Sequence, residues 1–229
     1  MGARVLFWDI DGTLLTTKRA GLLALEEAAR EVCGSSPDFG RLKTSGLTDH
    51  EVAELAIREC GSEPTPETAS ALLRSYERHL PEVLGERQGG PLPGVVEILD
   101  ALEERDDVIS LLLTGNTSSG ASAKLEHYGL AGYFAGGAFC VDGDDRPEIA
   151  RRALEIAAEH AGERIDPEST FVIGDTPHDI RCGQEIGART VAVASGTYAL
   201  DELERCDPWL ALEELPDPPR FIQLLMLGR

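Results

Sequence analysis

The chain has 229 residues, 42% of them hydrophobic, and a formal net charge of −20 at pH 7. This length can bury one sizeable core, or one core with a small accessory domain. The negative charge argues against a nucleic acid or an anionic membrane as partner, because most of the surface would repel both. The five cysteines form no CxxC pair, and the N-terminus lacks a signal-peptide pattern. Both features predict a cytoplasmic protein with reduced thiols.

The first expected element is a strand over residues 3–8, ARVLFW, and two aspartates follow it directly, in Asp9-Ile-Asp-Gly-Thr13. Side chains alternate in direction along a strand, so Asp9 and Asp11 tend to point the same way. Two like charges held close together repel, and one tends to stay protonated unless a cation intervenes. The pair is therefore either a solvated turn or a site that needs a metal and a proton carrier.

Helical patterns alone fill the next part of the chain. Amphipathic stretches occupy 20–34, 49–61 and 66–84, and the Gly/Pro-rich segment 89–94 returns the chain to the sheet. The pattern predicts a helical insertion that covers the active end of the sheet as a cap. The expected division is an α/β core of residues 1–15 and 92–229 and a helical cap of residues 16–91.

Strands and helices alternate in the remainder of the chain. The expected strands are 108–114, 169–175 and 189–195, and the expected helices are 94–106, 119–129, 147–162 and 179–188. This alternation predicts βαβ units and a doubly wound, mostly parallel α/β sheet, in which ligands bind beyond the carboxyl ends of the strands. The apolar runs are too short for a membrane span.

Two further polar motifs follow strands, LTGNT at 113–117 and IGDTPHD at 173–179. If the strands are parallel, three polar strand ends converge on one crevice. The side chains brought together there would be Asp9, Asp11, Thr114, Asp175 and Asp179. So many carboxylates need a hard divalent cation, and Mg²⁺ is the natural candidate.

Each motif also has a plainer interpretation. An isolated D-x-D-G is often a turn after a strand, and Thr-Gly-Asn is often a helix cap. A calcium-binding loop is excluded, because Gly12 comes too early and no glutamate stands at the closing position. The three motifs together, in this order and each at a strand end, favour the site.

With these motifs, the sequence resembles the haloacid dehalogenase (HAD) superfamily, in its phosphatase branch with a helical (C1-type) cap, phosphoglycolate phosphatases included. DIDGTLL resembles the first family motif, LLTGN the second and GDTPHDI the fourth, and CDPWLALEEL resembles the last short strand and its loop. The similarity covers essentially the whole chain, including the place of the cap.

The resemblance implies a role for each residue. Asp9 would be the nucleophile, and Asp11 the general acid and then the base. Mg²⁺ would be held by Asp9, the backbone carbonyl of Asp11, Asp175 and Asp179, and the phosphoryl oxygens by the Thr114 hydroxyl and the Gly115 amide. The implied activity is Mg²⁺-dependent hydrolysis of a small phosphorylated metabolite through an aspartyl-phosphate. An acid at position 11 argues against a dehalogenase.

The third family motif normally supplies a lysine, but the matching segment here, GDDRP at 143–147, supplies Arg146. We favour Arg146 as the phosphate-binding cation, because it keeps the charge and can bind phosphate bidentately. The alternative for Arg146 is a surface ion pair with Asp144 or Asp145. Lys124, the other candidate, falls inside a helix and is interpreted as a solvated surface lysine.

The cap segment TSGLTDH, residues 44–50, precedes a helix. Thr48 and Asp49 are expected either to cap that helix or, as in similar capped phosphatases, to contact the leaving group. Rival functions are a phosphomutase with the same residues and a non-catalytic binding protein. The substrate is open among phosphoglycolate, sugar phosphates and nucleotides, and so is the choice between monomer and homodimer.

Overall fold

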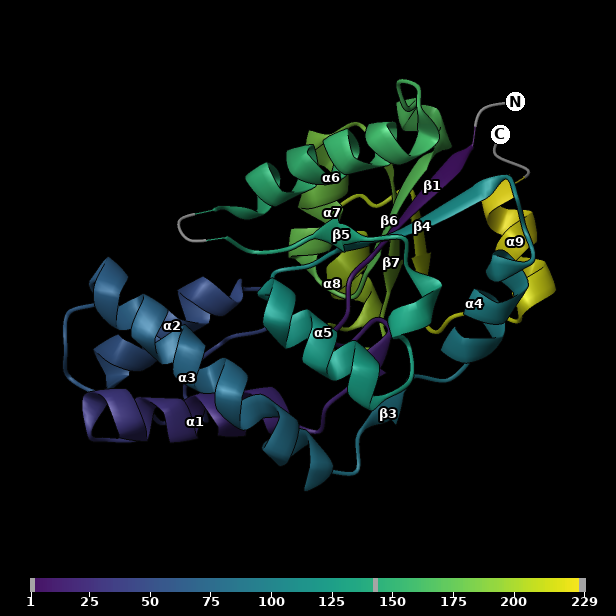
Figure 1. Ribbon diagram of the computed structural model, residues 1–229. Helices are drawn as coiled ribbons and strands as arrows, with labels where there is room; N and C mark the ends of the chain where they lie inside the picture. The colour runs from purple at the N-terminus through teal and green to yellow at the C-terminus, as the bar shows by residue number, and fades with distance from the viewer. Residues whose placement is uncertain (1–2, 142–143, 227–229) are drawn as a thin grey trace.

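The computed structural model describes residues 3–141 and 144–226. A six-stranded sheet in which every neighbouring pair is parallel forms its centre (Figure 1). In spatial order the strands are β5 (Gly137–Ala138), β4 (Val108–Leu113), β1 (Arg4–Trp8), β6 (Thr170–Gly174), β7 (Arg189–Val193) and β8 (Leu210–Leu212). The predicted α/β class and parallel sheet are confirmed.

Helices cover both faces of this sheet. The alternation along β1 separates the two layers, because Leu6 and Trp8 belong to one apolar cluster whereas Val5 and Phe7 belong to the other. The first face packs against α4 (Val95–Glu103), α5 (Ser118–His127) and α9 (Pro218–Met226), and the second against α6 (Arg146–Ala161) and α7 (Pro177–Glu185). The short α8 (Leu200–Glu204) packs near β7 and α7. A strand buried on both faces explains the continuous apolar runs in the sequence.

The first three helices of the described chain lie beyond the end of the sheet (Figure 1). They are α1 (Ala20–Cys33), α2 (Asp49–Glu59) and α3 (Pro66–Gly85), and they share an apolar cluster of their own that includes Leu25, Ile57 and Leu72. The chain enters this group through β2 (Leu15–Thr16) and leaves it through β3 (Gly90–Pro91), which pair antiparallel. The predicted cap boundaries fall at these two strands, and the division into domains stays a prediction.

The strand order brings the polar motifs to one edge of the sheet. β4, β1 and β6 are neighbours and run in the same direction, so residues 114, 9 and 175 follow adjacent strand ends. Within the part of the chain that the structure describes, no helix combines the length and the apolar composition needed to cross a membrane.

Candidate active site

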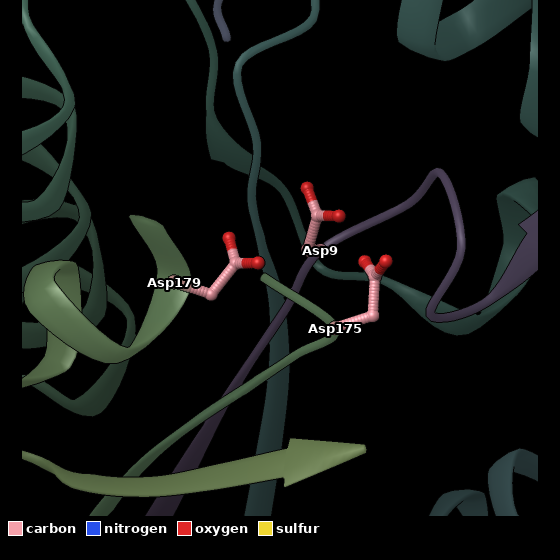
Figure 2. A group of neighbouring side chains, drawn as sticks. All are labelled: Asp9, Asp175 and Asp179. Carbon is pink, nitrogen blue, oxygen red and sulfur yellow. The ribbon is translucent and has the colours of Figure 1, made fainter. Parts of the chain in front are cut away.

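Three carboxylates meet at the carboxyl edge of the sheet (Figure 2). Asp9 follows β1, Asp175 follows β6, and Asp179 lies in the first turn of α7. Each offers an oxygen, all three lie within 4.8 Å of one another, and all three residues are buried. Residues that are distant in the sequence therefore form one acidic cluster, which the motif order had predicted.

Hydroxyl and amide donors hold the cluster in place. The Thr13 hydroxyl donates to Asp175 Oδ1 at 3.2 Å. The backbone amide and hydroxyl of Thr176 donate to Asp179 Oδ2, at 3.0 and 2.6 Å. Gly12 has φ +88°, and a Cβ there would lie 2.5 Å from Asp175 Oδ2. The turn after β1 therefore needs a glycine at this position, both for its backbone conformation and for the approach of the carboxylate.

The electrostatics of this cluster favour a bound cation. Burial, and then the Asp179 carboxylate, raise the pKa of Asp9 well above its ordinary value. The same two causes raise the pKa of Asp175 to about 8. Buried like charges resist ionisation unless a positive charge joins them. Closely spaced carboxylate oxygens are the donor set that hard divalent cations such as Mg²⁺ prefer, so these residues fit a divalent metal.

Asp11 lies beside this cluster but has different partners. The Lys124 ammonium donates to Asp11 Oδ2 at 2.5 Å and to Asn116 Oδ1 at 2.7 Å, and the Asn116 amide donates to Asp11 Oδ2 at 3.0 Å. The carboxylate, the amide and the ammonium thus form a closed triangle of hydrogen bonds. The two aspartates of the first motif therefore have different environments: Asp9 joins the acidic cluster, and Asp11 joins a cation and an amide.

The prediction that Lys124 is a solvated surface lysine is wrong, because its exposed fraction is 3%. It lies on the inner face of α5, three residues after Ala121 and next to Leu125, which are both buried. Helical spacing was the signal that could have identified it. Asn116 was overlooked as a separate site residue, although it stands inside the second motif.

Arg146 is also buried, at 9% exposure. Its Nη1 donates to Asp179 Oδ1 at 3.2 Å, and its Nε to the Gly46 carbonyl at 3.1 Å. The alternative of a surface ion pair is wrong, because Asp145 caps α6 and Asp144 pairs with Arg152. Residue 143 of this motif lies outside the described residues. Both candidate cations therefore lie at the site, Lys124 on Asp11 and Arg146 on Asp179.

The predicted phosphate-binding residues follow β4. Thr114 is fully buried, and its hydroxyl accepts from the backbone N–H of Asn116 at 3.3 Å. Segment 44–49 lies directly over Gly115: the Asp49 amide donates to the Gly115 carbonyl at 2.7 Å. A Cβ on Gly115 would lie 3.0 Å from the Leu47 carbonyl oxygen. Glycine therefore allows the segment before α2 to pack against this turn.

Thr48 and Asp49 differ in their contacts. Thr48 caps α2 in a capping box with Glu51, as one of the two interpretations predicted. The Asp49 carboxylate instead accepts from the Thr117 amide at 2.8 Å, at the start of α5. It therefore joins the start of α2 to the helix that carries Lys124.

A cavity of about 420 Å³ contains the predicted nucleophile. Its polar lining includes Asp9, Asp11 and Asp175, and further lining residues come from parts of segments 15–25 and 44–52 and from Tyr76. This volume lies within the range of pockets for small molecules. Three further lining residues follow β7, and no sequence motif had identified them: Ser195, Gly196 and Thr197.

Comparison with known proteins decides the family. The model of the haloacid dehalogenase-like hydrolase family matches residues 6–184. The chain belongs to this family.

Named relatives of this hydrolase support the match along most of its length. It is 26% identical to a protein named probable phosphatase IndB from Dickeya dadantii, over 91% of this chain and 89% of the relative. It is 27% identical to a phosphoglycolate phosphatase from Aquifex aeolicus, over 86% and 88%. A hydrolase from Pseudomonas syringae has a similar structure, with a TM-score of 0.71, 25% identity and coverage of 98% and 97%.

Proposed function

We propose that this HAD-like hydrolase is a Mg²⁺-dependent phosphatase that hydrolyses a small phosphomonoester through an aspartyl-phosphate on Asp9. The observation that carries the proposal is the buried cluster of Asp9, Asp175 and Asp179, together with a cavity that Asp9, Asp11 and Asp175 line. The names of the two relatives, a phosphatase and a phosphoglycolate phosphatase, support the same reaction class.

In the first half of the reaction, a carboxylate oxygen of Asp9 attacks phosphorus, and the bond from phosphorus to the leaving oxygen breaks. Asp11 donates a proton to that oxygen, so the leaving group departs as an alcohol. The Thr114 hydroxyl, the Gly115 amide and the Arg146 guanidinium are the proposed donors to the phosphoryl oxygens.

In the second half, Asp11 takes a proton from water. The water oxygen attacks phosphorus, and the bond to Asp9 breaks, which releases phosphate and restores the carboxylate. Asp9, Asp175, Asp179 and the Asp11 carbonyl are the proposed holders of Mg²⁺. The metal, when bound, neutralises charge between the nucleophile and the phosphoryl oxygens.

Replacing Asp9 by Asn tests this mechanism. We expect Asp9→Asn to abolish phosphate release from p-nitrophenyl phosphate in Mg²⁺, because the amide is a poor nucleophile. Asp106→Asn is the matched control: it makes the same change at an exposed residue between α4 and β4, and it should keep full activity.

Two results would contradict the proposal: phosphate release that survives Asp9→Asn, or wild-type activity that survives removal of divalent metal by EDTA. Measurement of free phosphate also separates a phosphatase from a phosphomutase, which would return the phosphoryl group to a sugar and release none.

A further inference from the structure

The cavity has apolar lining residues as well as carboxylates. Its walls include Leu22 and Leu25 of α1, Leu47, and Val52 of α2. If phosphorus lies at Asp9, the leaving group occupies the rest of the cavity, which these apolar residues help to line. Arg19, at the start of α1, lines the same cavity.

The cations around the cavity differ in whether they are already paired. Three line it: Arg19, Lys124 and Arg146. Lys124 forms an ion pair with Asp11, and Arg146 with Asp179. Across residues 3–141 and 144–226, the Arg19 guanidinium has no hydrogen-bonding or acidic partner. Arg146 is the proposed cation for the phosphoryl group and Lys124 is bound to Asp11, so Arg19 is the positive charge that is left for a second anionic group.

Arg19 lies in a strained turn that sets the position of its backbone. Lys18 and Arg19 have φ of +48° and +70°, a left-handed conformation that is costly for residues with side chains. The Arg87 guanidinium donates to the Lys18 carbonyl at 3.2 Å, and the Lys18 amide to the Thr16 hydroxyl at 3.3 Å. Such strain persists only where neighbouring contacts enforce it, and it is concentrated at functional sites.

We propose that Arg19 binds a second anionic group, a carboxylate or a second phosphate, on the leaving group of the substrate. Leu22 and Leu25 would contact the short carbon chain between the two anionic ends. This inference rests on the proposed phosphatase function and narrows it to phosphomonoesters whose alcohol carries a negative charge. Arg19 would then act on substrate choice and not on the chemical step.

Three phosphate esters with a two-carbon leaving group, which differ in the charge of that group, provide the test. Ethyl phosphate has a neutral leaving group, 2-phosphoglycolate carries a carboxylate, and ethylene glycol bisphosphate carries a second phosphate. We expect Arg19→Gln to lower kcat/KM about five- to tenfold for at least one anionic ester, mainly through KM, because an exposed ion pair contributes modestly. For ethyl phosphate, kcat/KM should change less than twofold. In 1 M salt, the difference in kcat/KM between wild type and Arg19→Gln on the anionic esters should become smaller.

Lys18→Gln is the matched control, because Lys18 is an adjacent exposed cation with a similar backbone that does not line the cavity. Lys18→Gln should leave kcat/KM unchanged for all three esters. Arg19→Lys should keep part of the preference for anionic esters that Arg19→Gln loses. The anionic ester whose kcat/KM falls more in Arg19→Gln identifies the second group as carboxylate or phosphate. An equal loss on all three esters, or no loss on either anionic ester, would overturn the inference.

A binding measurement separates this inference from the proposed function. In the Asp9→Asn background, calorimetry should show weaker binding of 2-phosphoglycolate or ethylene glycol bisphosphate when Arg19→Gln is added. If the wild-type enzyme hydrolyses no ester, the phosphatase proposal fails and this binding difference still decides the role of Arg19. If it hydrolyses them and Arg19→Gln changes neither binding nor KM, the inference alone fails.

Discussion

At the scale of single residues, the burial of Lys124 has an electrostatic consequence. Burial lowers the pKa of this ammonium, but the Asp11 carboxylate, Tyr76 and Asp49 together raise it above its ordinary value. Lys124 therefore stays charged although it is removed from water. A buried charge that keeps its partners is expensive to isolate, so Lys124 and Asp11 depend on one another.

Substituting Lys124 tests that dependence. We expect Lys124→Met to lower kcat/KM for p-nitrophenyl phosphate by about 100-fold or more, because Asp11 loses the cation that positions it for proton transfer. Methionine has a similar length and suits a buried position, so urea unfolding should show a folded protein. The exposed Lys43→Met is the control. A folded Lys124→Met enzyme with at least half of the wild-type activity would refute the assigned dependence.

At the scale of elements, segment 44–49 packs on the start of α5 through a buried acid. Burial raises the pKa of Asp49 to about 6, against the opposing effect of Lys124. An unfolded aspartate titrates near pH 4, so between about pH 4 and 6 the folded state binds more protons than the unfolded state. The contribution of Asp49 to stability is present below pH 4 and is lost as pH rises through 6.

Asp49→Asn should remove this pH dependence while keeping an oxygen that accepts from the Thr117 amide. From pH 4 to 6.5, the free energy of unfolding of Asp49→Asn relative to wild type should rise by up to about 3 kcal/mol, measured by urea denaturation. For the control Asp106→Asn, the difference in the free energy of unfolding from wild type should not change over this pH range. An equally flat difference for Asp49→Asn would show that Asp49 ionises normally in the fold.

Helices and strands could be predicted where their hydrophobic pattern extends over enough residues. The expected helix at 147–162 corresponds to α6 at Arg146–Ala161, and the strand at 189–195 to β7 at Arg189–Val193. β5, β2 and β3 have two residues each, too few for any pattern, and tertiary contacts define them. The acidic cluster was predictable because parallel strands share an edge, whereas the partners of Lys124 depend on how α5 packs.

At the scale of the whole molecule, a cation at the acidic cluster should change global stability. Ligands that bind only the folded state stabilise it by mass action, by about 2.7 kcal/mol at 100 times Kd. We therefore expect saturating Mg²⁺ to raise Tm by several degrees over its value in EDTA, by calorimetry.

Asp175→Asn provides the control for that experiment. It removes one proposed ligand and one like charge, so Mg²⁺ should shift its Tm little, and its Tm in EDTA should equal or exceed that of the wild type. The Thr13 hydroxyl can still donate to the amide oxygen. A wild-type Tm that does not respond to Mg²⁺, or a full response in Asp175→Asn, would contradict the metal assignment.

The pairing of β2 with β3 also has a consequence for how the protein can evolve. The chain leaves the sheet layer at Leu15 and returns at Pro91, and these two residues are register partners. An inserted segment with adjacent ends can be lengthened, shortened or exchanged without altering the order of the six strands. Arg19 and the apolar wall lie inside that segment, whereas Asp9 and Asp175 lie outside it. Exchange of this segment would therefore replace the proposed substrate-selecting residues and leave the proposed catalytic carboxylates in place.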